Sequence, residues 1–88
     1  MQQTAETVWG SCLDFVQDNI QKQAFKTWFM PIVPVKLNGA ALSIQVPSKF
    51  FYEWIEEHYI KILKVALTKE LGDEARLVYI IKMENTYG

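Results

Sequence analysis

The sequence has few of the residues that usually build reactive sites. Its 88 residues include one cysteine, Cys12, and one histidine, His58. A single cysteine excludes an internal disulfide, and no cysteine and histidine cluster is available to hold zinc. The four glycines are scattered, so no glycine-rich loop can wrap a phosphate. We therefore predict that the chain is not an enzyme and binds no cofactor of its own.

Charge of one sign and long apolar runs are also lacking. Nine basic and ten acidic residues give a net charge of −1 and are spread along the chain. Strong binding to nucleic acid through phosphate neutralisation is therefore not expected. No apolar run approaches the roughly 20 residues that span a bilayer, and residues 1–6 do not resemble a secretory signal. These features predict a soluble, cytoplasmic protein with no membrane contact.

Hydrophobic residues make up 50% of the chain and aromatic residues 14%, which is enough for a packed core. A domain of this size buries roughly 60 to 65% of the surface of its unfolded chain. The periodicity predicts an α+β domain over residues 1–83, with helices packed on a three-stranded sheet. Residues 84–88 are expected to begin a linker to absent downstream domains. The expected order is helix 4–19, helix 21–30, strand 32–37, strand 42–46, helix 48–71 and strand 76–83.

Several local signals set the expected positions of these elements. Thr4 is a plausible N-cap, and Gly72 is the expected end of the long helix. Pro34 weakens its strand and is tolerable at an edge or a bulge. The last strand has apolar residues on both faces, which favours an interior position or a covered edge.

Four aromatic residues in five positions begin the long helix, and they cannot all share one face. At about 100° per residue, Phe51 and Tyr52 fall on the apolar stripe of the helix. Phe50 points instead toward the side of Lys61 and Lys64, and Trp54 lies at the boundary. A large apolar side chain on a polar helix face indicates a contact surface.

Two parts of the sequence combine in a pattern typical of one family. The first is Phe25, Trp28 and Pro31, and the second is residues 46–51 with Trp54. Together with Trp9 they resemble the N-terminal domain, domain I, of the bacterial chromosomal replication initiator DnaA. The resemblance covers nearly the whole chain and implies a fold similar to a K-homology (KH) domain.

The resemblance also implies what the domain does. In this family the domain carries protein contacts: self-association of initiators at the origin, recruitment of the replicative helicase, and binding of species-specific regulators. ATP binding and origin recognition belong to later domains of the full-length protein.

The first helix carries the residues that the resemblance connects with self-association. Trp9 matches a family position used for this purpose, and Val8 is its neighbour. By periodicity, Trp9 lies near the edge of the apolar stripe. A core tryptophan and an exposed interface tryptophan both remain open at this stage.

The second and third helices carry the residues that the resemblance connects with the helicase and regulators. Phe50 matches a position implicated in helicase contact, and Lys49 is beside it. Ala24 stands where some members carry a glutamate that also touches the helicase. That departure weakens the polar half of the contact, for which Gln23 or Lys26 could substitute.

A weak single-stranded nucleic-acid-binding module is the alternative, because a related fold binds single strands. The usual site in that fold requires two glycines three residues apart, and this chain has no such pair. Lys49, Lys61 and Lys64 could still make weak contacts with DNA. Tight, strongly salt-dependent binding of single strands would favour this alternative.

Overall fold

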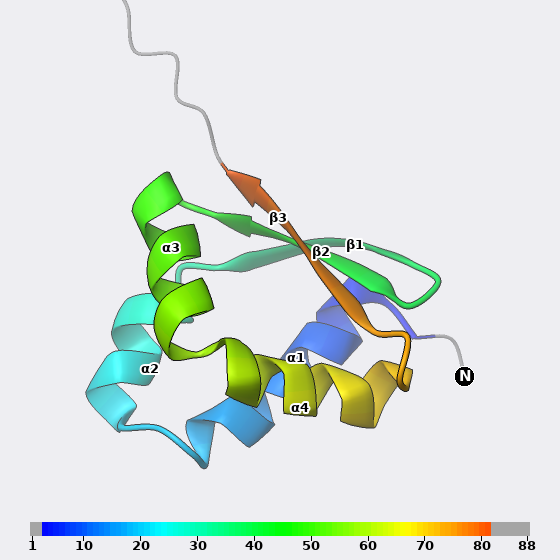
Figure 1. The fold of residues 1–88 in the computed structure, drawn as a ribbon, viewed down its shortest axis with the longest axis horizontal. Coiled ribbons are helices and arrows are strands. Elements are labelled where there is room, and N and C mark those ends of the chain that lie inside the picture. The colour runs from blue at the N-terminus through cyan, green and yellow to red at the C-terminus, as the bar shows by residue number, and fades with distance from the viewer. Residues whose placement is uncertain (1–2, 82–88) are drawn as a thin grey trace, which may run out of the picture.

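The computed structural model describes residues 3–81, which form four helices and three strands in an α+β arrangement (Figure 1). The predicted fold class is therefore confirmed. In chain order the elements are α1 (Ala5–Gln17), α2 (Lys22–Trp28), β1 (Val33–Asn38), β2 (Ala41–Val46), α3 (Lys49–His58), α4 (Ile60–Leu71) and β3 (Arg76–Ile81). Thr4 caps α1 as predicted, because its hydroxyl accepts a hydrogen bond from the Thr7 amide at 3.1 Å.

The three strands form one sheet in the order β1-β2-β3. β1 and β2 form an antiparallel hairpin, and the register shifts between Pro34 and Lys36. Pro34 thus lies on an edge strand beside a bulge, as its missing amide hydrogen requires. β2 pairs with β3 in parallel, so the chain must cross over between them through α3 and α4.

The central strand β2 supplies the sheet's contribution to the core. Leu42, Ile44 and Val46 are fully buried and face the helices. β3 lies at the other edge of the sheet, with Leu77 and Tyr79 packed toward the core. Its alternate residues are exposed, so the expected interior or covered position of this strand is wrong. Residues 82 and 83 of the predicted strand, and the predicted linker at 84–88, lie outside the described residues.

The long helix predicted over residues 48–71 is two helices that meet at Tyr59. This residue has φ −126° and ψ 2°, which is not helical, although its amide still donates to the Ile55 carbonyl at 2.8 Å. The Tyr59 ring packs edge-on against Phe29 at 5.4 Å. The break lets α3 lie against α2 and the sheet while α4 turns to lie along α1 (Figure 1). One straight helix could not pack both against α2 and the sheet and along α1.

Trp9 belongs to the core, so the alternative of an exposed interface tryptophan is wrong. Its side chain is only 2% exposed, and its neighbour Val8 is fully buried. The reason is tertiary: α4 and the sheet both pack on α1, which widens the buried stripe beyond the width that periodicity predicts. The indole Nε1 has no hydrogen-bond partner among the described residues.

Cys12 is fully buried one turn after Val8, on the same stripe of α1. Burial, and secondarily the negative charge of Glu70, raise the pKa of the Cys12 thiol to about 12. The thiol is therefore protonated and packed as a small apolar group.

We predict that Trp9→Ala lowers the free energy of unfolding by about 3 to 5 kcal/mol, since it leaves a large cavity in the core. Trp9→Phe should cost distinctly less, because it fills more of the space and removes an unsatisfied buried donor. Urea denaturation followed by circular dichroism measures both changes. A Trp9→Ala variant with the wild-type midpoint would contradict the buried position of the ring.

Cys12 should resist thiol reagents in the folded protein. At mildly alkaline pH its thiolate fraction is about a thousandfold below that of an unshifted thiol. The rate of reaction with Ellman's reagent should therefore follow the rate or extent of unfolding as urea is added. Rapid labelling in the absence of denaturant would show that the thiol is accessible in the folded state.

Candidate protein-interaction surface

The start of α3 holds Phe50 out of the core. Ser48 is the N-cap, with extended backbone angles of φ −159° and ψ 169°, although its hydroxyl makes no capping hydrogen bond. Its carbonyl accepts hydrogen bonds from the amides of Phe51 and Tyr52 at 3.1 and 3.4 Å. In the helix that begins here, Phe51 packs against the core and Phe50 is 75% exposed. The predicted outward position of Phe50 is confirmed.

A stack of aromatic rings joins α3 to α2. Trp54 lies parallel to Trp28, with ring centroids 4.9 Å apart and an interplanar angle of 13°. Trp28 also contacts Phe51 edge-on at 5.0 Å. Trp54 also touches His58, whose ring centroid is 4.0 Å away. Trp54 remains 40% exposed, which matches its predicted place at the boundary.

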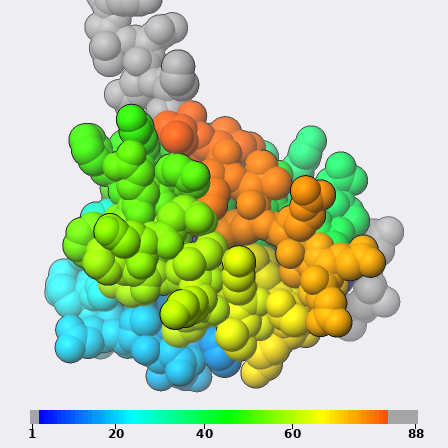
Figure 2. Space-filling model, in the orientation of Figure 1, coloured from blue at the N-terminus to red at the C-terminus, as the bar shows by residue number. Residues whose placement is uncertain are grey.

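Phe50, Trp54 and His58 follow one another at four-residue spacing, so they lie along one side of α3. We call these three residues, with Trp28, the aromatic ridge. Figure 2 shows the rounded, outward-facing surface of α3 in green, beside the cyan surface of α2. The ridge is an exposed apolar surface on regular secondary structure, the kind of feature that marks interaction sites.

A second contact fixes α3 against the sheet. The Tyr79 hydroxyl of β3 donates a hydrogen bond to Glu56 Oε2 of α3 at 2.8 Å. Burial, and then this hydrogen bond, raise the pKa of Tyr79 well above its usual value. The Tyr52 ring packs edge-on against Tyr79 with centroids 4.8 Å apart. Tyr52 is nevertheless 38% exposed, so its predicted place in the core is wrong: its ring packs on Tyr79 at the surface.

Lys49 lies next to Phe50 at the start of the ridge. Its ammonium is 3.9 Å from Glu53 one turn later, and both side chains are largely exposed. An ion pair of this kind adds little stability. It places one positive and one negative group beside the exposed phenyl ring, where they would form part of the rim of a contact.

The three predicted residues of α2 do not share one face. Ala24 is half-buried one turn before Trp28, on the side of α2 that meets α3. Gln23 is exposed, and its amide Nε2 donates to the Thr27 hydroxyl at 3.4 Å. Lys26 lies about 160° around the helix from Ala24. The structure therefore brings Ala24 toward the ridge and leaves Lys26 on the opposite side.

Val8 and Trp9 are not brought to any surface, since both are in the core. The contacts of the Trp54 ring with Trp28 and His58 were not predicted from the sequence. The four-residue spacing of Trp54 and His58 could have indicated their contact, but the stacking on Trp28 depends on how α2 and α3 meet.

Over residues 3–81, no group of histidine, cysteine and carboxylate side chains is placed to hold a metal ion. Within that range no helix is long and apolar enough to cross a membrane.

Comparison with known proteins shows the family of this domain. Residues 6–69 match the family model described as the DnaA N-terminal domain. The chain is 70% identical over all 88 residues to a chromosomal replication initiator protein DnaA from Flavobacterium psychrophilum, and 51% identical over 84 residues, 96% of the chain, to that from Chlorobaculum tepidum. It spans 18% and 17% of the lengths of these relatives. The chain therefore belongs to the family of DnaA N-terminal domains, which form the N-terminal region of chromosomal replication initiator proteins.

Proposed function

We propose that this chain is a non-catalytic interaction domain through which the initiator recruits the replicative helicase and binds regulators at the origin. The observation that carries the proposal is Phe50, a large apolar side chain left 75% exposed at the start of a firmly held helix. ATP binding and origin recognition would belong to the rest of the initiator, since this chain spans less than a fifth of its relatives.

The energetics of interfaces support this role for Phe50. Binding energy is concentrated in a few aromatic or arginine side chains that enter pockets on the partner. Such anchors are most effective when little flexibility is lost on binding. The Trp28–Trp54 stack and the Tyr79–Glu56 hydrogen bond hold α3 on two sides, so Phe50 is presented on a rigid element.

Weak contacts at this surface are sufficient if several copies act together. Initiators assembled at one origin would present several Phe50 surfaces to the helicase. Linked copies raise the effective concentration of each further contact, so the whole assembly can bind far more tightly than one domain.

Replacing Phe50 by alanine should weaken binding to the replicative helicase at least tenfold, or by about 1.4 kcal/mol or more. The free energy of unfolding should change by no more than about 0.5 kcal/mol, since the ring has few contacts within the domain. Surface plasmon resonance against the helicase measures binding, and urea denaturation measures stability.

Val65→Ala is the matched control, because Val65 is also exposed, at 50%, but lies on α4. It should bind the helicase like the unmodified domain. Equal loss of binding in both variants, or no loss in a folded Phe50→Ala variant, would contradict the assigned surface.

Self-association is the second part of the proposal. Because Val8 and Trp9 are buried, we propose the outer face of α1 as its contact surface. Gly10 lies in the middle of this face and is exposed. Apart from its chain neighbours and the adjoining backbone of α1, no atom of the described residues lies within 4 Å of the position that a Cβ would occupy. A glycine within a helix costs about 0.5 to 1 kcal/mol relative to alanine. No contact within the described residues explains this cost, whereas close approach of a second copy would.

Gly10→Arg should therefore reduce self-association while preserving or raising the melting temperature. The arginine has room within the domain and a higher helix propensity, but it would obstruct close packing between two α1 helices. Sedimentation velocity over a range of concentrations measures the association. The same concentration dependence in Gly10→Arg and the unmodified domain would exclude this face of α1.

A further inference from the structure

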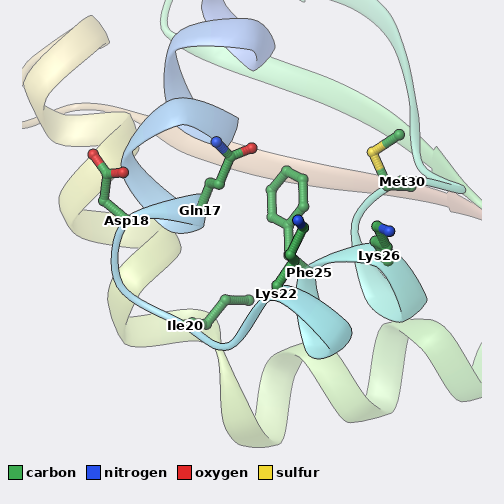
Figure 3. A pocket seen from close by; sticks show the side chains of 7 residues that line it. All are labelled: Gln17, Asp18, Ile20, Lys22, Phe25, Lys26 and Met30. Atoms are coloured by element: carbon green, nitrogen blue, oxygen red, sulfur yellow. The ribbon is translucent and has the colours of Figure 1, made fainter.

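A groove of about 500 Å³ lies between the end of α1 and α2 (Figure 3). The Phe25 ring lies in it between Gln17 of α1 and Met30 beyond α2 (Figure 3). Ile20, from the loop that joins the two helices, adds a third apolar surface. Volumes of about 300 to 1,000 Å³ are typical of pockets that hold ligand groups.

The rim of the groove is positively charged along α2. Lys22 and Lys26 both line it, and their four-residue spacing places them on one side of the helix. Both are exposed, and neither has a carboxylate within ion-pairing distance among residues 3–81. One acidic residue, Asp18, lines the opposite end at the C-cap of α1. The two ammonium groups are thus available to a partner.

We propose that this groove binds an acidic amphipathic helix from a partner protein. Apolar side chains of that helix would pack on Met30 and on the exposed parts of Ile20 and of Phe25, which is 8% exposed. Two of its carboxylates, one turn apart, would pair with Lys22 and Lys26. This is helix-in-groove recognition, in which an apolar face gives affinity and the flanking charges give orientation and choice of partner.

Met30 supports a protein segment as the occupant. Its side chain is 62% exposed, although methionine is among the more apolar residues. Methionine is flexible and polarizable, and it is common on surfaces that adapt to the side chains of partner helices. A single basic residue would not select a partner, but two lysines at helical spacing match carboxylates at the same spacing on a second helix.

The groove is distinct from the helicase surface proposed above. Ala24 and Trp28 face α3, whereas Lys22 and Lys26, which line the groove, lie about 120° to 160° away from them around α2. One domain could therefore hold both partners at once. Failure of either proposal leaves the other intact, because Phe50 does not line the groove.

Two designed helical peptides test the proposal on the 88-residue chain. They share one leucine-rich face and differ only at the flanking polar positions, which are glutamate in one and lysine in the other. Titration into the isotope-labelled domain, followed by chemical-shift mapping, should show saturable binding of the glutamate peptide at Ile20, Lys22, Lys26 and Met30. The lysine peptide should bind at least tenfold more weakly.

Charge reversal provides the decisive variant. Lys22→Glu combined with Lys26→Glu should exchange the preference of the groove, so that the lysine peptide binds more tightly. Lys61→Glu combined with Lys64→Glu, on exposed positions of α4, is the matched control and should keep the original preference. Equal binding of both peptides, shifts confined to the Phe50 surface, or an unchanged preference after reversal at α2 would overturn the proposal.

Discussion

The parallel pairing of β2 with β3 is the constraint on which the rest of the structure depends. Parallel neighbours cannot be joined by a tight turn, so the chain between Val46 and Arg76 must cross the sheet. It does so with two helices, and the first begins three residues after β2 ends. Phe50, the most exposed aromatic residue within residues 3–81, is therefore placed directly beyond the end of the central strand. Its position is set by the sheet and not by a flexible loop.

The small size of the domain explains why so many aromatic rings meet at its surface. The helices and the sheet enclose one core, and Trp9, Phe25 and Phe29 already occupy much of it. At the edges of the core, Trp28 and Trp54 then pack on each other and Tyr52 packs on Tyr79, and Trp28, Trp54 and Tyr52 stay partly exposed. Such rings stabilise the joins between elements and also remain available to partners. Stability and recognition thus use the same side chains in this domain.

The sequence predicted most of the elements because their signals are local. Caps, prolines and alternating residues depend on neighbours along the chain, which is why Thr4 and Pro34 were placed correctly. Prediction from the sequence failed where contacts between distant segments determine the local structure. The break at Tyr59 has no proline or glycine to indicate it, and it follows from packing on Phe29 and from the need to cover two parts of the fold. Tyr52 was misplaced because its partner, Tyr79, lies on another element.

By itself the sequence determined the fold class, the family resemblance and the outward position of Phe50, since helical periodicity alone separates Phe50 from the apolar stripe. Only the tertiary structure decided that Trp9 is in the core, because the burial of a residue at the edge of a stripe depends on how many elements pack against it. The tertiary structure also decided whether each residue of α2 lies on the side of α3 or on the side of the groove. Ala24 and Lys26 are two positions apart, yet one faces α3 and the other lines a groove beside α1. The reason is that packing partners determine which side of a helix is covered and which side remains exposed. The sequence of the helix alone does not determine where those partners lie.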